Sequence, residues 1–346
     1  MRAGRFTRVS RVTYVVAVAT LCVVMTGCGG SSTSGTAAGG DGSGAADGKT
    51  TVGMALVGPR NDGGFAQSHY EGLLEAEKTL NVKGTAVDNI PPGQPRLEAL
   101  KNLALTNDLV IGVGAEFAPA GVAIAAQFPD VEFVIINGQL SQHAPNLHVY
   151  FAREGVPAYI AGAVATKLSQ TGTVGFVGGE LIPPTTQSDD AFKAAVQATD
   201  PSVQTLSINT GDFNNVAEAK QATATEIAQG ADVIFLMLDN AIEGAQQAIR
   251  ESGKDVKVFS IIVPRCETAK NIVGCATLQS SKLVQDVVKD FQGKTLPPDV
   301  KAYGVENPDV QAFELCPDWR TPELVTLVED LTEQINKGKI TLPEGV

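Results

Sequence analysis

Polar side chains follow several apolar runs of this 346-residue chain, in places where they could hydrogen-bond a small ligand. Carboxylates and amides at such positions recognise hydroxyl and amino groups. These candidate residues are Asp62, Gln67, Glu116, Asp239 and Asn240. Covalent chemistry lacks comparable support, because the chain has no nucleophile elbow, no HExxH motif, no P-loop and no histidine placed among carboxylates. The pattern therefore predicts a binding protein rather than an enzyme.

Three cysteines late in the chain, Cys266, Cys275 and Cys316, predict one disulfide and one free thiol in an oxidising compartment. We expect a Cys266–Cys275 bridge, because these residues flank a nine-residue step between two expected strands. A bridge to Cys316 is the alternative. No CxxC motif occurs, and the histidines lack ligand-like spacing to the cysteines, so neither a metal site nor a cofactor is expected. The histidines are His69, His143 and His148.

Short apolar runs alternate with amphipathic stretches from Thr51 onward. Strands are expected at 51–57, 82–90, 109–114 and 132–137, and helices at 65–80, 95–105 and 118–128. The runs at 109–113 and 133–136 are apolar without alternation, as in strands that are covered on both faces. Repeated strand–helix units of this kind predict an α/β fold built on doubly wound parallel sheets.

The strand–helix pattern restarts after the first 153 residues, so two lobes of similar size are expected. We predict an N-terminal lobe over 50–153 and a C-terminal lobe over 154–282. Helices near 283–291 and 322–337 are expected to return to the N-terminal lobe, which residues 283–346 would complete. Two lobes joined by more than one crossing segment leave a cleft between them. The ligand is expected there, at the carboxyl ends of the parallel strands.

The first fifty residues predict export and a membrane anchor. Arginines between Arg2 and Arg11 precede an apolar run of roughly 14 residues, too short to span a bilayer and typical of a signal peptide, expected over 1–27. Thr26-Gly27-Cys28 resembles a lipobox, whose cysteine is acylated; an incidental cysteine is the alternative. The segment 28–49 is rich in glycine and serine and would be a flexible tether. We therefore expect a lipid-anchored protein on the extracytoplasmic face of the cell membrane.

The charge of the chain bears on its partners. It holds 38 acidic and 26 basic residues, a net charge of −12, and loss of the signal peptide would remove four arginines and no acid, leaving −16. Such a surface repels phosphate backbones. A nucleic acid is therefore not an expected partner.

Several short motifs, all in the same order, resemble the basic membrane protein (BMP) family of ABC-transporter substrate-binding lipoproteins. They include Asp62-Gly-Gly-Phe65, Tyr70-Glu-Gly72, Ile111-Gly-Val-Gly114, Phe128-Pro-Asp130, the segment from Gly172 to Gly179, Gly211-Asp-Phe213-Asn, Asp232-Val-Ile-Phe235, and the segment from Ile335 to Pro343. Together they span nearly all of residues 51–343. The resemblance, to bacterial purine nucleoside receptors in particular, implies the type I periplasmic-binding fold, with an ABC permease and ATPase as partners.

In that family the purine lies between two phenylalanines, and the resemblance implies Phe65 and Phe235 as their counterparts here. Neither ring could hold a base alone, so a ring on each lobe would make the ligand favour the closed state. The implied ligand is a purine nucleoside or purine base, captured for an importer. A ligand-sensing lipoprotein that signals without transport, and a receptor for a non-purine metabolite, are the alternatives.

Departures from the family pattern concern the sugar end of the ligand. Ala66 stands where the family has an asparagine, and Asn137 stands where a strand normally ends in an aspartate. Ile262 replaces a ribose-binding aspartate, and a lysine expected after the next strand is absent. A free base or another flat heterocycle is therefore expected as readily as an intact nucleoside. Arg265, just beyond Ile262, either enters the cleft or lies in a surface turn braced by a disulfide.

Overall fold

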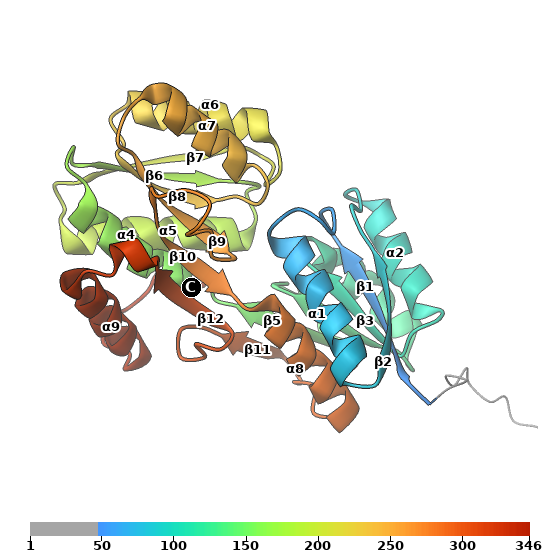
Figure 1. Cartoon of the computed structure of the whole chain (residues 1–346). Helices are drawn as coiled ribbons and strands as arrows, with labels where there is room; N and C mark the ends of the chain where they lie inside the picture. The colour runs from blue at the N-terminus through green and yellow to red at the C-terminus, as the bar shows by residue number, and fades with distance from the viewer. Residues whose placement is uncertain (1–47) are drawn as a thin grey trace, which may run out of the picture. The chain divides into compact units, whose positions relative to one another are not determined.

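The computed structural model describes residues 48–346, so the predicted signal peptide, Cys28 and nearly all of the predicted tether lie outside the described residues. The described chain forms two α/β lobes, each built on a six-stranded sheet (Figure 1). The prediction of an α/β fold with two lobes is confirmed.

The sheet of the N-terminal lobe is entirely parallel, with the strand order β11-β5-β4-β3-β1-β2. Its strands are β1 (Thr50–Leu56), β2 (Val82–Val87), β3 (Leu109–Val113), β4 (Glu132–Ile136), β5 (Leu147–Ala152) and β11 (Val300–Tyr303). Helices α1 (Phe65–Thr79) and α8 (Ser280–Gly293) pack together over one face, and α2 (Gln94–Ala104) and α3 (Ala118–Ile124) over the other. These layers bury both faces of the central strands.

The sheet of the C-terminal lobe has the order β12-β10-β9-β8-β6-β7, and only β12 runs antiparallel to its neighbour. Its strands are β6 (Thr173–Gly178), β7 (Gln204–Asn209), β8 (Val233–Met237), β9 (Lys257–Ile262), β10 (Ile272–Leu278) and β12 (Gln311–Leu315). Helices α4 (Gly155–Leu168) and α5 (Pro183–Thr199) cover one face, and α6 (Val216–Ala228) and α7 (Ile242–Ser252) the other. Helix α9 (Pro322–Asn336) packs on α4.

Continuous apolar runs form the central strands of both sheets. All five residues of β3 and all five of β8 are buried, as their lack of alternation predicts for strands with helices on both faces. The burial of apolar side chains between sheet and helices is the dominant force that assembles each lobe. It also fixes the strand ends, from which the functional loops emerge.

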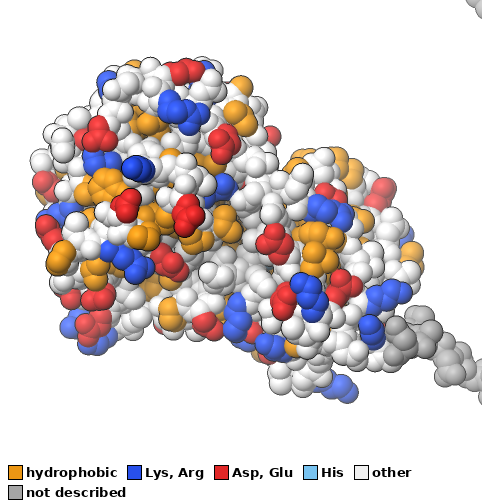
Figure 2. All heavy atoms as spheres, viewed as in Figure 1, with side chains coloured by type: hydrophobic (Ala, Val, Ile, Leu, Met, Phe, Trp, Pro, Cys, Tyr) orange, Lys and Arg blue, Asp and Glu red, His pale blue; other side chains and the backbone are white. Residues whose placement is uncertain are grey.

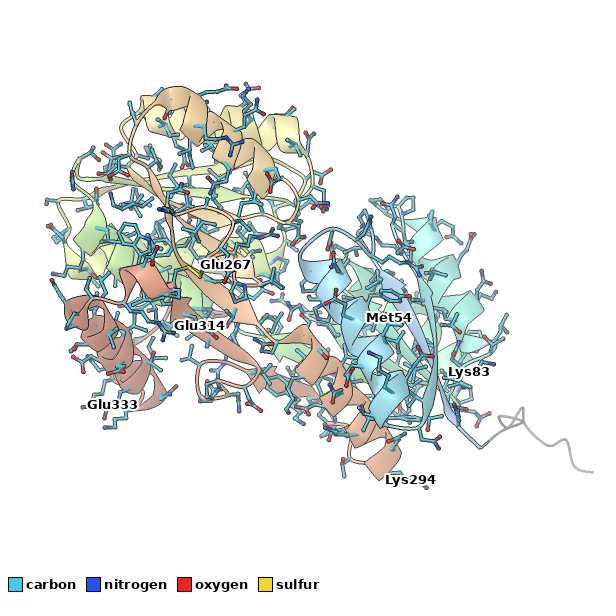
Figure 3. The ribbon with its side chains drawn as sticks, in the orientation of Figure 1. Met54, Lys83, Glu267, Lys294, Glu314 and Glu333 are labelled. Carbon is cyan, nitrogen blue, oxygen red and sulfur yellow. A yellow bond between two sulfur atoms is a disulfide. The ribbon has the colours of Figure 1, made fainter. Side chains whose placement is uncertain are left out.

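The predicted completion of the N-terminal lobe by residues 283–346 is only partly right. Helix α8 and β11 join that lobe, but β12 pairs with β10 and α9 packs on α4, both in the C-terminal lobe. Figure 1 shows α8 beside α1 and α9 beside α4, and Figure 3 shows Lys294 and Glu333 on these two different lobes. The chain therefore crosses between the lobes after β5, after β10 and after β11.

The predicted Cys266–Cys275 disulfide is wrong. The bridge joins Cys266 to Cys316, and Cys275 is a free, fully buried thiol. Cys275 lies inside β10, between β9 and β12, so its side chain belongs to the core of the sheet. Because β12 runs antiparallel to β10, its end brings Cys316 back beside the start of β10, within reach of the β9–β10 loop.

Acidic and basic side chains are interspersed over the face shown in Figure 2, with small apolar patches between them. No field of a single sign covers this face, although the net charge of the chain is −12. Among residues 48–346, no helix combines the length and apolar character that a membrane span requires.

Candidate functional site

A cavity of about 370 Å³ lies between the lobes, at the carboxyl ends of strands from both sheets. The N-terminal lobe lines it with the loops after β1, β2, β3 and β4, and the C-terminal lobe with the loops after β6, β7, β8 and β9. Ligand pockets range from about 300 to 1,000 Å³, so this volume suits a small molecule. Its place is the one that parallel α/β sheets give to their ligands.

Two phenylalanines line the cavity, one from each lobe: Phe65 and Phe213. Phe65 begins α1 and packs against His69, with the ring centroids 4.4 Å apart. Phe213 lies in the loop after β7, and its carbonyl accepts hydrogen bonds from the backbone N–H groups of Asp239 and Ala241. A Cβ on Gly179 would lie 2.3 Å from the Phe213 ring. Only a glycine at this position therefore allows the ring to pack so close to the backbone.

Phe235 does not stack in this cavity, which corrects the expectation drawn from the family resemblance. The residue is the middle one of β8, is 1% exposed, and stacks on Phe176 in the core with a centroid distance of 5.4 Å. It touches only a recess of about 10 Å³ behind the cavity, too small for a base. Met237, two residues further on the same face of the strand, reaches the cavity instead.

The loop between β1 and α1 is built by two of the predicted site residues. Asp62 is buried, and its carboxylate accepts hydrogen bonds from three backbone N–H groups, those of Gly64, Ala66 and Gln67. The Gln67 side chain in turn accepts a bond from the Gly63 N–H. Asp62 lines the cavity with its acceptors already occupied, and Gln67 does not line it. Both residues therefore shape the loop that presents Phe65.

Asp239 joins the lobes rather than facing the cavity alone. Its Oδ1 accepts a hydrogen bond from the backbone N–H of Phe65 at 3.0 Å. Gly64 makes this approach possible, because a Cβ there would lie 2.0 Å from the same oxygen. Burial, reinforced by the Asp62 carboxylate, raises the pKa of Asp239 to about 8.

Two further predicted residues lie at this junction and not among the residues that line the cavity. The backbone N–H of Asn240 donates a hydrogen bond to Asn214 Oδ1 at 3.4 Å, and the Asn240 side chain lies near Gly63. Arg265 donates from Nη2 to the Gly63 carbonyl at 2.6 Å. The expectation that Arg265 contacts the ligand is therefore replaced by a contact between the lobes.

Asn137 lines the cavity at the end of β4 and is fixed by two hydrogen bonds. Its Oδ1 accepts from the Ala152 N–H at 2.8 Å, and its Nδ2 donates to Glu154 Oε1 at 2.6 Å. It adopts a φ of +58°, a left-handed conformation that asparagine tolerates better than most residues. Burial raises the pKa of Glu154, which also lines the cavity, to about 7.

Glu116 and Glu180 face the cavity from opposite lobes. Glu116 Oε2 is buried and has no hydrogen-bond partner among the described residues. Burial raises the pKa of Glu116, Arg96 lowers it, and the Glu180 carboxylate adds to the rise. The described lining holds six acidic residues and one basic residue, Arg96, so it offers little positive charge to an anionic ligand. The acidic residues are Asp62, Glu116, Glu154, Glu180, Asp212 and Asp239.

The C-terminal wall of the cavity is apolar, with Met237, Ile261 and Ile262 side by side. Ile262 has a φ of +64°, and the Val263 N–H bonds the Ile261 carbonyl at 2.8 Å across it. A β-branched residue in this γ-turn conformation is strained, and such strain is found where the surrounding structure holds a functional turn. No hydroxyl-binding group stands at this position.

Sequence reasoning missed several residues that line the cavity. Phe213, Met237, Arg96 and Glu180 were not among the predicted site residues. A signal for Phe213 was present, because it follows an expected strand within the glycine-containing motif Gly211-Asp-Phe213-Asn. Asp212 also lines the cavity, and Asn215, one turn later, is the residue whose side chain caps α6.

Two of the solved structures that are similar to this chain are solute-binding proteins of ABC transporters. One from Aeropyrum pernix K1 covers 85% of this chain and 94% of its own length, with a TM-score of 0.76 and 18% identity. Another, from Conexibacter woesei, covers 85% of this chain and 98% of its own length, with a TM-score of 0.65 and 22% identity. These likenesses establish the fold.

Relatives in sequence carry more specific names. A purine-binding protein of Brucella abortus is 27% identical over 217 residues, 62% of this chain, and the match spans 60% of that relative's length. The nucleoside-binding protein BmpA of Lactococcus lactis is 26% identical over 307 residues, 82% of this chain and 86% of its own. The family model described as ABC transporter substrate-binding protein, PnrA-like, matches residues 49–298. This chain therefore belongs to the Bmp family of ABC-transporter substrate-binding proteins.

Proposed function

We propose that the protein binds a purine base or purine nucleoside in the cavity between its lobes and delivers it to an ABC importer. The observation that carries the proposal is the pair Phe65 and Phe213, which line one cavity from opposite lobes. Base–aromatic stacking contributes roughly 1–3 kcal/mol per ring. A base held between two such rings stabilises the closed arrangement, because each lobe contributes one ring.

The polar lining supports a neutral, donor-rich ligand. Carboxylates such as Glu116 and Glu154, together with Asn137, offer acceptors for amino, imino and hydroxyl groups. The apolar wall of Ile261 and Ile262 offers no partner for a sugar hydroxyl. Names of similar proteins, one purine-binding and one nucleoside-binding, are consistent with both ligand forms. Within this class, we favour the free base over the nucleoside.

A panel of purines tests the proposed ligand class. Adenine, guanine, adenosine and guanosine would be compared with AMP and with ribose by thermal shift, and binders would be measured by isothermal titration calorimetry. A ligand at 100 times its Kd stabilises the fold by about 2.7 kcal/mol, which raises the Tm by several degrees. We expect a base or nucleoside to raise the Tm and AMP not to, because the lining is acidic. A chain stabilised by none of the four, or by AMP as strongly, would contradict the proposal.

We also propose that Cys28 carries a lipid that holds the protein on the outer face of the cell membrane. The support is the lipobox-like Thr26-Gly27-Cys28 after the apolar run, in a family whose members serve membrane transporters. Cys28→Ser should move the protein from the membrane fraction to the soluble fraction. Retention of the variant in the membrane fraction would show that another feature anchors it.

A further inference from the structure

The β9–β10 loop reaches across to the N-terminal lobe through one side chain. Arg265 Nη2 donates to the carbonyl oxygen of Gly63 at 2.6 Å, a contact between residues 202 positions apart. Gly63 belongs to the β1–α1 loop, which carries Phe65 into the cavity. The arginine therefore holds the loop that presents one of the two rings lining the cavity.

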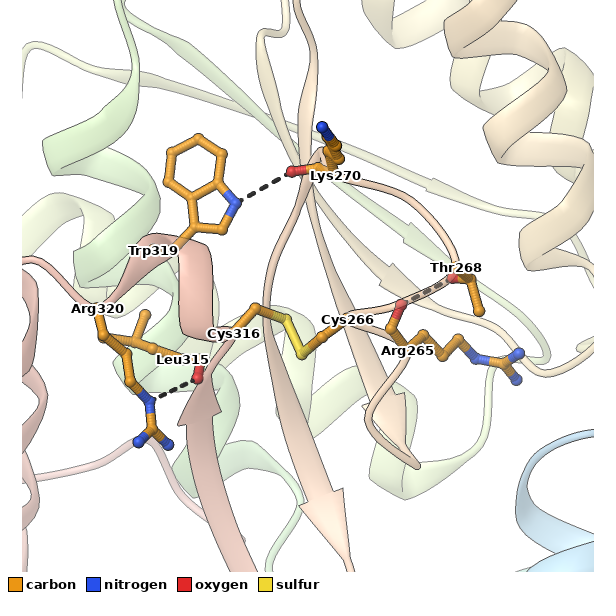
Figure 4. Close-up of a disulfide and its surroundings, with 8 residues drawn as sticks. All are labelled: Arg265, Cys266, Thr268, Lys270, Leu315, Cys316, Trp319 and Arg320. Carbon is orange, nitrogen blue, oxygen red and sulfur yellow. Dashed lines mark hydrogen bonds between the residues drawn. A yellow bond between two sulfur atoms is a disulfide. The ribbon is translucent and has the colours of Figure 1, made fainter.

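The position of Arg265 is fixed from its own lobe. The next residue, Cys266, is bonded to Cys316 at the end of β12. The Arg265 carbonyl accepts two bonds from Thr268, one from the backbone N–H at 2.9 Å and one from Oγ1 at 2.7 Å. Further along the same loop, the Trp319 indole N–H donates to the Lys270 carbonyl at 3.2 Å. Figure 4 shows Thr268 next to Arg265, and the Arg265 side chain directed away from the disulfide and from Trp319.

A second contact joins the β1–α1 loop to the C-terminal lobe, and Arg265 interacts electrostatically with the residue that makes it, Asp239. Asp239 Oδ1 accepts from the Phe65 N–H, and the Arg265 guanidinium lowers the pKa of Asp239 against the larger effect of burial. The Asp62 carboxylate lies on the opposing lobe and acts in the other sense. Arg265 is thus a cation that favours the charged form of Asp239, whereas the Asp62 carboxylate from the other lobe disfavours it.

We propose that Arg265 is a positioning residue for the binding site: it holds the Phe65 loop against the C-terminal lobe in the closed, ligand-binding arrangement, and the Cys266–Cys316 disulfide fixes where it stands. Arg265 does not line the cavity, so we expect other residues to contact the ligand. Only the affinity measurement below rests on the proposed purine function.

Arg265→Gln tests this role, with Arg320→Gln as its matched control. Arg320 also donates to a backbone carbonyl beside the same disulfide, that of Leu315 at 3.1 Å, but within the C-terminal lobe. We expect Arg265→Gln to increase the radius of gyration of the ligand-free protein in small-angle scattering. We also expect a roughly tenfold weaker Kd for adenine or adenosine, because a hydrogen bond to a charged group is lost. Arg320→Gln should match the wild type in both.

A Cys266→Ser/Cys316→Ser variant tests the anchoring, alone and combined with Arg265→Gln. If the disulfide acts by fixing Arg265, the cysteine variant should shift the same two quantities, and adding Arg265→Gln should change little more. Additive effects would overturn the anchoring. If circular dichroism shows that the cysteine variant does not fold, Thr268→Val takes its place, because it removes one anchor of Arg265 and leaves the disulfide intact.

The outcomes separate this proposal from the proposed function. A larger radius of gyration in Arg265→Gln alone, with no purine bound by any variant, supports the positioning role and rejects the purine ligand. Arg265→Gln and Arg320→Gln with equal radii of gyration overturn the positioning role, whatever the ligand proves to be. A weaker Kd for Arg265→Gln with an unchanged radius of gyration would also overturn it, since Arg265 would then affect binding without holding the lobes together.

Discussion

Phe213→Ala is expected to weaken the binding of adenine or adenosine by tenfold or more. The ring lines the cavity from the C-terminal lobe, and loss of one stacking partner costs roughly 1–3 kcal/mol, while tenfold corresponds to about 1.4 kcal/mol. The variant should still fold, because Phe213 is half-buried in a loop and packs against the edge of the core rather than inside it. Titration calorimetry on purified variant and wild type measures the change.

Phe235→Leu is the matched control for Phe213→Ala, because it alters a ring of the same type in the same lobe. Phe235 packs in the core against Phe176, Phe192 and Phe259, so its loss should cost roughly 1–2 kcal/mol of stability and lower the Tm by a few degrees. Its Kd should stay within about twofold of the wild type. The reverse result, with normal binding in Phe213→Ala and weak binding in Phe235→Leu, would restore the pair expected from the family resemblance.

Phe65→Ala extends the test to the other lobe. If Phe65 and Phe213 stack on the same base, each single variant already loses most of the stacking, because one ring alone binds the base weakly. The double variant should then lose less affinity than the sum of the two single losses. Strict additivity would mean that the two rings contact different parts of the ligand.

The difference between the expected and observed aromatic pair has a physical cause. Every residue of β8 is apolar and buried, so the sequence carries no alternation to say which side chain reaches the strand end. A cavity at the carboxyl end of a sheet touches the last residue of a strand and the loops at that end. Met237, the last residue of β8, and Phe213, in the loop after β7, therefore line it, while Phe235 does not. The place of the site was therefore predictable from topology, but the ring on the C-terminal lobe was not.

The wrong disulfide and the wrong placement of the last elements have one common cause, which is the position of β12. Cys316 reaches Cys266 only because β12 adds to β10 in the antiparallel sense, and the apolar pattern of the sequence does not predict that strand. The strand has only five residues and lies at the edge of its sheet. Pairings between segments 50 residues apart depend on such long-range topology, which local propensity does not specify.

Glu226 is a buried carboxyl group away from the cavity, and it should make the stability of the protein depend on pH. The residue is 0% exposed on the inner face of α6, and neither carboxyl oxygen has a hydrogen-bond partner among the described residues. Gly175 on β6 leaves room for it, because a Cβ there would lie 1.9 Å from Oε2. The sequence held a signal: Glu226 falls on the stripe of Ala219, Ala222 and Ile227 that faces the sheet.

Burial, with a smaller contribution from the Asp189 carboxylate, raises the pKa of Glu226 from 4.5 to about 8, while the Phe176 backbone and Lys193 partly oppose the rise. The folded protein therefore keeps a proton that the unfolded chain releases above pH 4.5. This contribution is fully present below about pH 4.5, declines as the pH rises toward 8, and is lost above it.

Glu226→Gln should therefore be more stable than the wild type at pH 9 by roughly 2–4 kcal/mol, and close to it or slightly weaker at pH 5, since an amide cannot ionise. Urea unfolding at a series of pH values gives the two curves, and the difference between them should grow across the range from 4.5 to 8. Glu218→Gln, at an exposed position on the same helix, should run parallel to the wild type at every pH. Parallel curves for Glu226→Gln as well would mean that Glu226 is ionised in the folded protein, with Lys193 and the Phe176 backbone outweighing the cost of burial.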